Sequence, residues 1–543
     1  MTSTDIPLGK SRVVPGRYPP PGTDPYADAI RERRGARGLT PLDANLLHVP
    51  AIAGGYNTMM GAIRTGGKLP GDIREAMILR VAAINRAAFE WIQHEGIGRK
   101  EGLSIGQLYI IRDTETPLPP SPAVLNGLQS AAVAYTDYST RDIRVPMTAI
   151  QEFKDQLKIW AVSANPSMTT EEIEAKTDDL YVEAVMVVSA YNMVSRFLVA
   201  TDVAGLSDVE VPWPVDKKEH VISLPVFPPA SGPQQTIHAI ALITSPSAPW
   251  LVFMNSLLTD LTMWNYVVTY FLDLPSSGGK TYNILLHSQR GHGLSTLPPE
   301  GETQERLATI PLLAKDVVAL LETLWIPTPV HSVIGVSQGG AAALAFAAEF
   351  ADKTKSIVAC DTAPRTPAGN KDAWEDRIRL VHGGSEAPHD ANQYAKNVGM
   401  NQLAKVTVPR WFPAGSSCGP SATEGEARAR WVENMITKTD VTGFVNGARA
   451  LGDYDILNPT AGVGCLFDSS IARVLLLAGS LDGGGKVGKG LQELCGKWNE
   501  YLKAEGRTGT EVEFAEIENA GHLPMIDSPS KFCDRLGSWL ASF

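Results

Sequence analysis

The segment from His331 to Gly340, with the sequence HSVIGVSQGG, constrains the fold of this chain more than any other feature. It begins with an apolar, β-branched run, and small residues that favour a helix follow it. A Gly-x-Ser-x-Gly pattern between a strand and a helix predicts a nucleophile elbow, with Ser337 on the sharp turn. Gly335 and Gly339 permit that turn because a Cβ atom at either position would crowd it. We therefore expect Ser337 to be a hydrolytic nucleophile at the top of a sheet.

Length and composition limit the class of protein. A chain of 543 residues exceeds what one hydrophobic core organises, so we expect a multidomain protein. The net charge of −11 argues against nucleic acid as a partner. We expect no membrane helix, because no apolar run approaches the roughly 18–20 residues required, and Met1 to Asp5 lacks the basic start of a secretory signal. The five cysteines are odd in number and widely spaced, which favours reduced thiols and a cytoplasmic location.

The composition and the apolar pattern of the sequence change along the chain and predict four parts. Residues 1–40, rich in Pro, Gly and charge, are expected to form an N-terminal arm. Residues 41–204 carry long helical patterns and predict an all-α domain, in which one helix begins near Thr169 with a capping-box pattern. Residues 205–235 contain many prolines and predict a linker that merges into edge strands. Residues 236–543 then form the last part.

Strands that alternate with helices in this last part indicate a mostly parallel sheet covered on both faces. The predicted strands are Thr236–Thr244, Trp250–Asn255, Tyr282–His287, His331–Val336, Ser356–Asp361, Ala472–Ala478 and Val512–Ile517. A helical stretch at about 364–458 interrupts the alternation. We expect this stretch to form a cap over the strand ends.

A serine nucleophile needs a base and an acid, which follow it in the order Asp then His in this fold class. Asp482 follows an apolar strand and His522 follows the last strand, so both lie on loops at the edge that presents Ser337. Taken alone, Asp482 could be a turn residue before three glycines, and His522 could be a surface residue before a helix. Together with Ser337, the two residues favour a catalytic triad. The N–H groups of Gln338 and Leu257, with Ser256 as an alternative to Leu257, are expected to form the oxyanion hole.

Residues 220–543 resemble 3-oxoadipate enol-lactonases of the α/β-hydrolase fold. The segments that carry the resemblance are Asn255–Trp264, Gln289–Ser295, Gly335–Gly339, Asp361–Ala363, Trp374–Ile378 and Arg410–Phe412. Leu258 and Gln338 depart from the family, which usually has Gly and often Met there. The resemblance implies a small carboxylated lactone as substrate. It also implies that Arg377, Arg410 and Trp411 in the cap bind the carboxylate and cover the ring, although packing or solvated roles remain open for these three.

Glu90 and His94 are the first candidate site in the helical half. They stand four residues apart and share one helix face. A carboxylate beside an imidazole suits proton transfer near neutral pH, and a surface ion pair is the alternative. A metal site formed with Glu75 competes, but no histidine cluster accompanies these residues, so we expect neither a metal nor a cofactor.

The wider pattern of residues 40–200 resembles the carboxymuconolactone decarboxylase family. The matching residues are Pro70, Arg74-Glu75, Glu90 with His94, Gly96, Gly102 to Ser104, and Tyr191 to Phe197. The peroxidase branch of that superfamily uses a Cys-x-x-Cys ahead of the histidine. Here Ala87 and Glu90 occupy those positions and this half has no cysteine, which excludes peroxidase chemistry.

This second resemblance implies a decarboxylase, with His94 as proton donor and Glu90 and Glu75 orienting it. Arg74 and Arg80 are expected to hold substrate carboxylates. The two resemblances imply consecutive reactions of protocatechuate breakdown, in which a carboxymuconolactone passes through the enol-lactone to 3-oxoadipate in one bifunctional enzyme. They also imply a homo-oligomer formed through the N-terminal domain. The alternative is a serine hydrolase of another small ester or lactone, with the N-terminal domain serving only oligomerisation.

Overall fold

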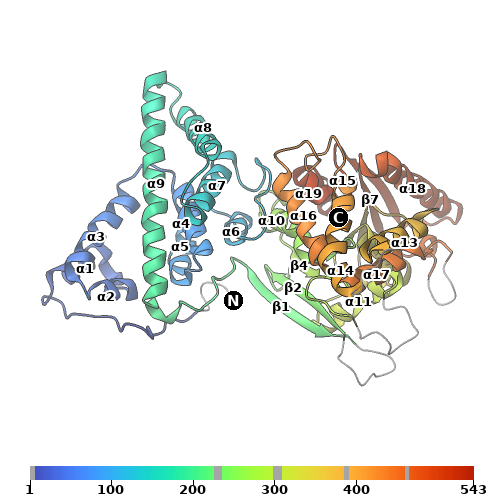
Figure 1. Cartoon of the computed structure of the whole chain (residues 1–543), viewed down its shortest axis with the longest axis horizontal. Helices are drawn as coiled ribbons and strands as arrows, with labels where there is room; N and C mark the ends of the chain where they lie inside the picture. The colour runs from blue at the N-terminus through green and yellow to red at the C-terminus, as the bar shows by residue number, and fades with distance from the viewer. Residues whose placement is uncertain (1–5, 225–234, 298–307, 385–390, 459–463) are drawn as a thin grey trace. The chain divides into compact units, whose positions relative to one another are not determined.

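The computed structural model describes residues 6–224, 235–297, 308–384, 391–458 and 464–543. The chain forms two compact units, Met1–Asp216 and Lys217–Phe543 (Figure 1). The first unit is helical and the second is built on a sheet. Met1 to Asp5, the segment in which we expect no secretory signal, lies outside the described residues.

Helix α4 (Gly71–Ile84) forms the centre of the helical unit and is buried on almost every side. Its interior run from Glu75 to Ala83 is buried throughout, because four other helices surround it. Those helices are α5 (Ala88–Lys100), α6 (Ile105–Arg112), α7 (Gly127–Arg141) and α9 (Thr170–Ala200). Helix α8 (Met147–Ala164) packs on α7 and α9. Both α4 and α5 therefore place polar side chains in the interior of this unit.

Helix α9 begins at the predicted capping box, with Thr169 as N-cap and Glu172 completing the box. By length and composition alone, α9 is long and apolar enough to cross a membrane. Half of its most apolar window is buried against the rest of the unit, as in the core helix of a helical bundle.

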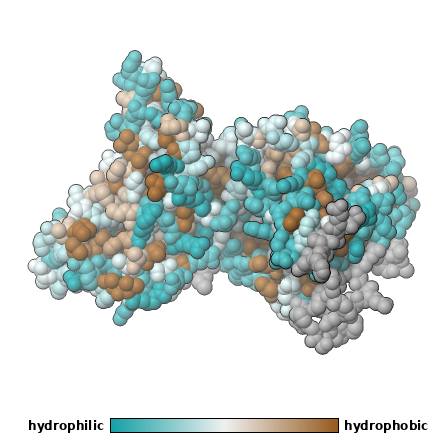
Figure 2. Space-filling model, viewed as in Figure 1, coloured by the Kyte–Doolittle hydropathy of each residue, from teal (hydrophilic) through white to brown (hydrophobic). Residues whose placement is uncertain are grey.

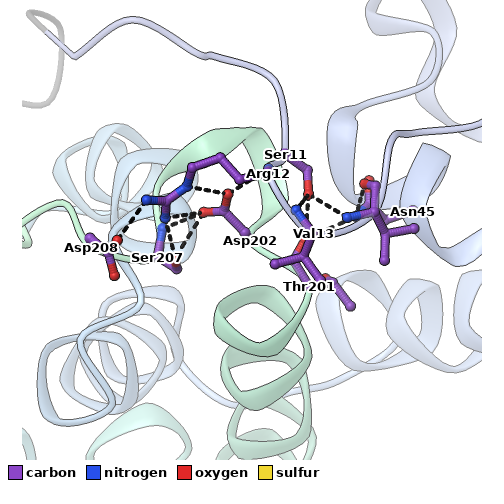
Figure 3. Close-up of polar contacts among 9 residues, drawn as sticks. Ser11, Arg12, Val13, Asn45, Thr201, Asp202, Ser207 and Asp208 are labelled. Carbon is purple, nitrogen blue, oxygen red and sulfur yellow. Dashed lines mark hydrogen bonds and ion pairs between the residues drawn. The ribbon is translucent and has the colours of Figure 1, made fainter.

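The N-terminal arm predicted for residues 1–40 is instead an integral part of the helical unit. It contains α1 (Pro25–Arg34), capped by Asp24, and the 3-10 turn η2 (Gly35–Arg37). Helix α1 packs on α3 (Pro50–Thr65), which follows α2 (Pro41–Leu46). Ahead of α1, the guanidinium of Arg12 lies 2.8 Å from Asp202 and 2.7 Å from Asp208 (Figure 3). These bonds join the start of the chain to the segment after α9, beside the turn η3 (Val203–Gly205).

The second unit holds one eight-stranded sheet in the order β1-β2-β4-β3-β5-β6-β7-β8. Strand β2 is antiparallel to β4, and the pairs from β4 and β3 through to β8 are parallel. The strands are β1 (Asp216–Ser223), β2 (Thr236–Ile243), β3 (Trp250–Met254), β4 (Asn283–His287), β5 (Ser332–Val336), β6 (Ser356–Cys360), β7 (Arg473–Gly479) and β8 (Glu511–Ile517). Strands β4, β5 and β6 are buried at every residue, as expected for strands covered on both faces.

Strand β1 lies at the edge of the sheet, within residues 205–235, where we expected a linker that merges into edge strands. Its sequence, DKKEHVIS, is mostly polar, and only Ile222 is buried. An edge strand of this kind lacks the apolar alternation that marks a strand in sequence.

Helices cover the sheet between the strands (Figure 1). Helix α12 packs on β3, β5 and β6, and α18 packs on β7 and β8. The covering helices are η4 (Leu261–Trp264), α10 (Asn265–Leu272), α11 (Ile310–Thr323), α12 (Gln338–Glu349), η5 (Ala351–Lys353), η8 (Leu466–Asp468), η9 (Asp482–Gly485), α18 (Lys486–Ala504), α19 (Pro524–Asp527) and α20 (Pro529–Ala541).

Between β6 and β7 the described chain is helical, in the region where we expected a cap. The helices of this cap are α13 (Asn370–Val381), α14 (Ala391–Tyr394), the π-helix η7 (Ala395–Gly399), α15 (Met400–Trp411), α16 (Glu426–Lys438) and α17 (Val441–Gly452). Helix α13 packs on α17, and α15 on α16. A bridge between Arg365 and Asp455 joins the two ends of this insertion.

Candidate active sites

Ser337 occupies a strained turn between strand β5 and helix α12. Its backbone has φ +56° and ψ −115°, a conformation that costs a non-glycine residue about 1–3 kcal/mol. The N–H of Ser337 donates to the carbonyl of Cys360 at 2.8 Å, which holds the turn against β6. A Cβ atom at Gly335 would clash with the backbone of Gly339, and one at Gly339 with the backbone of Met254. The two glycines are therefore required by close backbone contacts.

His522 and Asp482 form a pair at the ends of adjacent strands. The Nδ1 atom of His522 lies 2.8 Å from Oδ2 of Asp482. Burial acts to raise the pKa of Asp482, but the charge and hydrogen bond of His522 outweigh it and the pKa is lowered. Asp482 is thus held as a carboxylate, which orients the imidazole.

A cavity of about 940 Å³ brings Ser337, Asp482 and His522 together. Leu257 also lines it, as do Arg410 and Trp411 from the cap. Within the described ranges no hydrogen bond joins Ser337 to His522. The loose serine–histidine geometry found in many ligand-free hydrolases is compatible with this arrangement.

The amides of Leu257 and Gln338 border the Ser337 turn. Neither N–H has a hydrogen-bond partner in the described part of the chain, so both are available to an oxyanion. The turn after β3 is held by Leu258, which adopts φ +70° and donates its N–H to Nε2 of His292 at 3.1 Å. Burial lowers the pKa of His292 to about 4, so its ring is neutral and can accept this bond. The left-handed φ of Leu258 is a conformation that favours glycine, the residue that the resemblance to enol-lactonases led us to expect there.

The predicted cap residues have different positions. Arg410 lines the cavity, and burial followed by the charge of Arg377 lowers the pKa of Arg410 to about 10. Trp411 lies against His522, with ring centroids 5.5 Å apart. Arg377 does not line the cavity within the described residues: its guanidinium donates to the carbonyl of Ala373 at 2.7 Å and lies over Trp374. The prediction that Arg377 contacts substrate is wrong for this conformation, because that side chain packs along α13.

A second cavity, of about 480 Å³, lies inside the helical unit. His94 lines it, and Nδ1 of His94 lies 2.7 Å from Oε2 of Glu75, across helices α5 and α4. The edge of Tyr191 meets the His94 ring at a centroid distance of 5.0 Å. The hydroxyl of Tyr191 accepts a hydrogen bond from Nε of Arg64 at 2.9 Å. A paired imidazole, a tyrosine and an arginine thus converge on one cavity.

Glu90 does not orient His94, contrary to the prediction from their spacing. Glu90 lines the same cavity and is 2% exposed, yet both of its carboxyl oxygens lack a hydrogen-bond partner among the described residues. Burial raises the pKa of Glu90 well above its ordinary range. Burial also lowers the pKa of His94, against the opposing hydrogen bond of Glu75. Burial in the cavity wall therefore favours the neutral form of both side chains.

Arg74 and Arg80, both on α4, have opposite surroundings. Arg74 lines the cavity, 3.5 Å from Glu75. Arg80 is 2% exposed and its guanidinium is fully engaged by Asp137, at 2.8 Å, and by three carbonyls. The prediction that Arg80 binds substrate is wrong, because that side chain joins α4 to α6 and α7.

Several lining residues had no role in the sequence interpretation. In the helical unit these are Arg64 and three arginines of the supposed arm, Arg33, Arg34 and Arg37. In the second unit they include Asp361, which the sequence indicated only as part of a matching segment. Single arginines in a helical pattern carry no sequence signal of the cavity that they face. In the described ranges no group of three or more His, Cys, Asp or Glu side chains is arranged to hold a metal ion.

The strand order, the serine on a strand–helix turn and the helical cap define the fold class of capped serine hydrolases. Residues 251–535 match the model of the alpha/beta hydrolase family. That span is more than half of the chain, and the chain belongs to the α/β hydrolase family.

Curated relatives support lactone or ester hydrolysis. The 3-oxoadipate enol-lactonase 2 of Acinetobacter baylyi is 26% identical over 285 residues, covering 52% of this chain and 85% of the relative. The 3-oxoadipate enol-lactonase 1 of the same organism is 24% identical over 296 residues, covering 54% of this chain and 90% of the relative. Among solved structures, the enol-lactonase from Burkholderia xenovorans LB400 is 24% identical, with a TM-score of 0.41, and covers 57% of this chain and 97% of that one. The C-terminal unit thus resembles 3-oxoadipate enol-lactonases, and the family match leaves residues 1–250 outside it.

Proposed function

We propose that this chain converts a carboxymuconolactone to 3-oxoadipate in two steps. The helical unit decarboxylates the lactone, and the C-terminal unit hydrolyses the resulting enol-lactone. The observation that carries the hydrolytic step is the cavity shared by Ser337, by the His522–Asp482 pair and by the guanidinium of Arg410. The similarity to enol-lactonases supports the choice of substrate.

In the hydrolytic step, Ser337 Oγ attacks the lactone carbonyl while His522 accepts the serine proton. Asp482 holds the imidazole and stabilises its charge. The amides of Leu257 and Gln338 donate to the oxyanion of the tetrahedral intermediate. The ring C–O bond then breaks, His522 returns the proton to the enolate, and water releases the acyl group by the same route. Arg410 pairs with the carboxylate of the substrate.

In the decarboxylation step, the bond between the ring and its carboxylate breaks and CO₂ leaves. The electron pair enters the ring as a dienolate, which must then gain a proton. We assign Glu90 as the donor, in place of the His94 expected from sequence. Burial favours the protonated form of Glu90, whereas His94 commits its Nδ1–H to Glu75. Arg74 is then placed to bind a substrate carboxylate.

A second candidate function is the hydrolysis of another ester, with the helical unit serving only to assemble copies of the chain. The cavity around Ser337, at about 940 Å³, is large for a six-carbon lactone, which favours a bulkier substrate. Four large apolar residues, Val182, Met186, Met193 and Val199, lie exposed along α9, and Figure 2 shows apolar patches between hydrophilic ones on the helical unit. We propose that copies of the chain associate through this unit, in the cytoplasm and without nucleic acid or membrane.

Hydrolysis of freshly prepared 3-oxoadipate enol-lactone by the purified full chain tests the proposal. We expect 3-oxoadipate to form with a kcat/KM at least tenfold above that for p-nitrophenyl octanoate, a long neutral ester. Faster cleavage of the octanoate, with no turnover of the lactone, would overturn the proposal in favour of the second candidate.

A further inference from the structure

Asp361 is a buried acid directly behind the candidate triad. It follows the last residue of β6, and its N–H donates to the carbonyl of Leu477 on β7 at 2.9 Å. Asp482 stands three residues beyond the end of β7, so the two carboxyl groups meet at neighbouring strand ends. Both residues line the cavity that contains Ser337.

The hydrogen bonds of Asp361 leave one oxygen unexplained. Its Oδ1 accepts from the N–H of Gly479 at 2.8 Å, and the residue is only 2% exposed. Its Oδ2 has no donor among the described residues. The carboxylate of Asp482, at the end of the neighbouring strand, interacts with this side chain. Two carboxylates cannot bond to each other, because both only accept. A proton on Asp361 resolves this problem.

We propose that Asp361 is a positioning residue of the hydrolase: as the protonated acid, it donates a hydrogen bond through Oδ2 to Asp482 and holds that carboxylate toward His522. The proposal rests on the function proposed for Ser337, Asp482 and His522. Asp361 touches no substrate in this role. It acts through Asp482, which in turn acts through the imidazole.

The surroundings of Asp361 agree with a neutral form. Burial, and then the negative charge of Asp482, raise the pKa of Asp361 well above its ordinary range. The positive groups near the pair, His522 and Arg410, act on Asp482. The other titratable neighbour is the Cys360 thiol, which burial keeps neutral by raising its pKa. The backbone at Asp361 is also constrained, with φ +46°, as is common where a side chain must be held in place.

Two substitutions of Asp361 distinguish a side chain that acts as a hydrogen-bond donor from one that must ionise. Asp361→Asn keeps an acceptor for Gly479 and a donor for Asp482 and removes the proton equilibrium, whereas Asp361→Ala removes both. With p-nitrophenyl acetate as probe, we expect Asp361→Asn to keep kcat within about threefold of the wild type at pH 7. We expect Asp361→Ala to lose about 10–100-fold in kcat with little change in KM. We also expect the wild type to lose activity at alkaline pH as Asp361 ionises, and Asp361→Asn to lack that loss.

Equal impairment of the two variants, with thermal unfolding unchanged, would overturn the proposal, as would full activity of Asp361→Ala. If Asp361→Ala fails to fold, the infrared difference spectrum of wild type minus Asp361→Asn decides. The carbonyl band of a protonated carboxyl group is expected in that difference, and its absence would contradict the proposal. If the wild type cleaves neither the acetate nor the lactone, the proposed hydrolase function fails instead, while the infrared result still reports on Asp361.

Discussion

The imidazole of His94 is bonded to Glu75, with 2.7 Å between Nδ1 and Oε2, in the interior of the helical unit. Both residues are buried, at 6% and 2% exposure, so water competes little for this bond. A carboxylate partner at Nδ1 fixes the tautomer with the proton on Nδ1 and leaves Nε2 as an acceptor. In the proposed decarboxylase, His94 therefore polarises or orients substrate while Glu90 supplies the proton.

Loss of this pair should strongly slow the first step and spare the second. For His94→Ala or Glu75→Gln we expect CO₂ release from carboxymuconolactone to fall by about 10²–10⁴-fold. Hydrolysis of p-nitrophenyl acetate should be unchanged. His48→Ala is the matched control, because His48 lies in the same unit and does not line the cavity. CO₂ release that survives both substitutions would remove His94 and Glu75 from the chemistry.

The pH dependence of CO₂ release should report the protonated form of Glu90. Because burial raises the pKa of Glu90, the acid form persists to higher pH than for an ordinary glutamate. Activity should therefore fall as pH rises through that raised pKa. Glu90→Gln should be nearly inactive at every pH, since an amide transfers no proton. A wild-type profile that rises throughout this range would show that a base, not an acid, is required.

The raised pKa of Glu90 also makes the stability of the folded state depend on pH. A native pKa above the unfolded value of about 4.3 means that the folded state binds a proton that the unfolded chain releases. The contribution of Glu90 is therefore neutral below that value and becomes destabilising as pH rises above it, until the native carboxyl ionises. Glu90→Gln should unfold at a higher temperature than the wild type at pH 7, and at about the same temperature at pH 4. Equal melting temperatures at both pH values would contradict this account.

Arg80 and Arg74 lie on the same helix and should give opposite phenotypes. Arg80→Met breaks a buried ion pair and leaves Asp137 and three carbonyls without their donor, so we expect a loss of about 3–5 kcal/mol in the free energy of unfolding. Arg74→Met should leave urea denaturation nearly unchanged and raise KM for the lactone. A stability loss for Arg74→Met as large as for Arg80→Met would contradict these assignments.

Arg410 and Arg377 provide a similar contrast in the cap. Arg410→Ala should raise KM for the anionic enol-lactone about tenfold, the value of one charge-assisted hydrogen bond. KM for neutral p-nitrophenyl acetate should change little. Arg377→Ala should affect the lactone less, because Arg377 packs on Trp374 outside the cavity lining. Steady-state kinetics on both substrates distinguish these outcomes, and equal effects on the neutral ester would refute an ionic role.

The strands of the second unit could be predicted from the sequence, because short apolar runs and turn glycines mark them locally. Seven strands lie within one residue of their predicted ranges, and the glycines around Ser337 mark a turn that only they allow. Edge strands were expected near the end of the linker, but the bounds of β1 could not be predicted, since a polar edge strand shows no apolar alternation. The arm was also misjudged, because Arg12 reaches Asp202 across 190 residues. No local pattern encodes such a contact.

The helical site shows where spacing is insufficient. Glu90 and His94 share a helix face, yet the partner of His94 is Glu75 on another helix. Arg74 and Arg80 are both arginines of helix α4, and only the packing of α6 and α7 determines which of them is buried. Likewise Asp361 is an unremarkable residue at a strand end until the adjacent strand brings Asp482 beside it.

Product analysis on carboxymuconolactone, with the wild type beside Ser337→Ala, tests the two-step account most directly. The wild type should release CO₂ and form 3-oxoadipate. Ser337→Ala should release CO₂ at the same rate and accumulate the enol-lactone, because only the hydrolytic nucleophile is missing. Ser247→Ala, an exposed serine outside the cavity lining, is the matched control and should behave as the wild type. Unchanged carboxymuconolactone, with no CO₂ from either protein, would contradict the account.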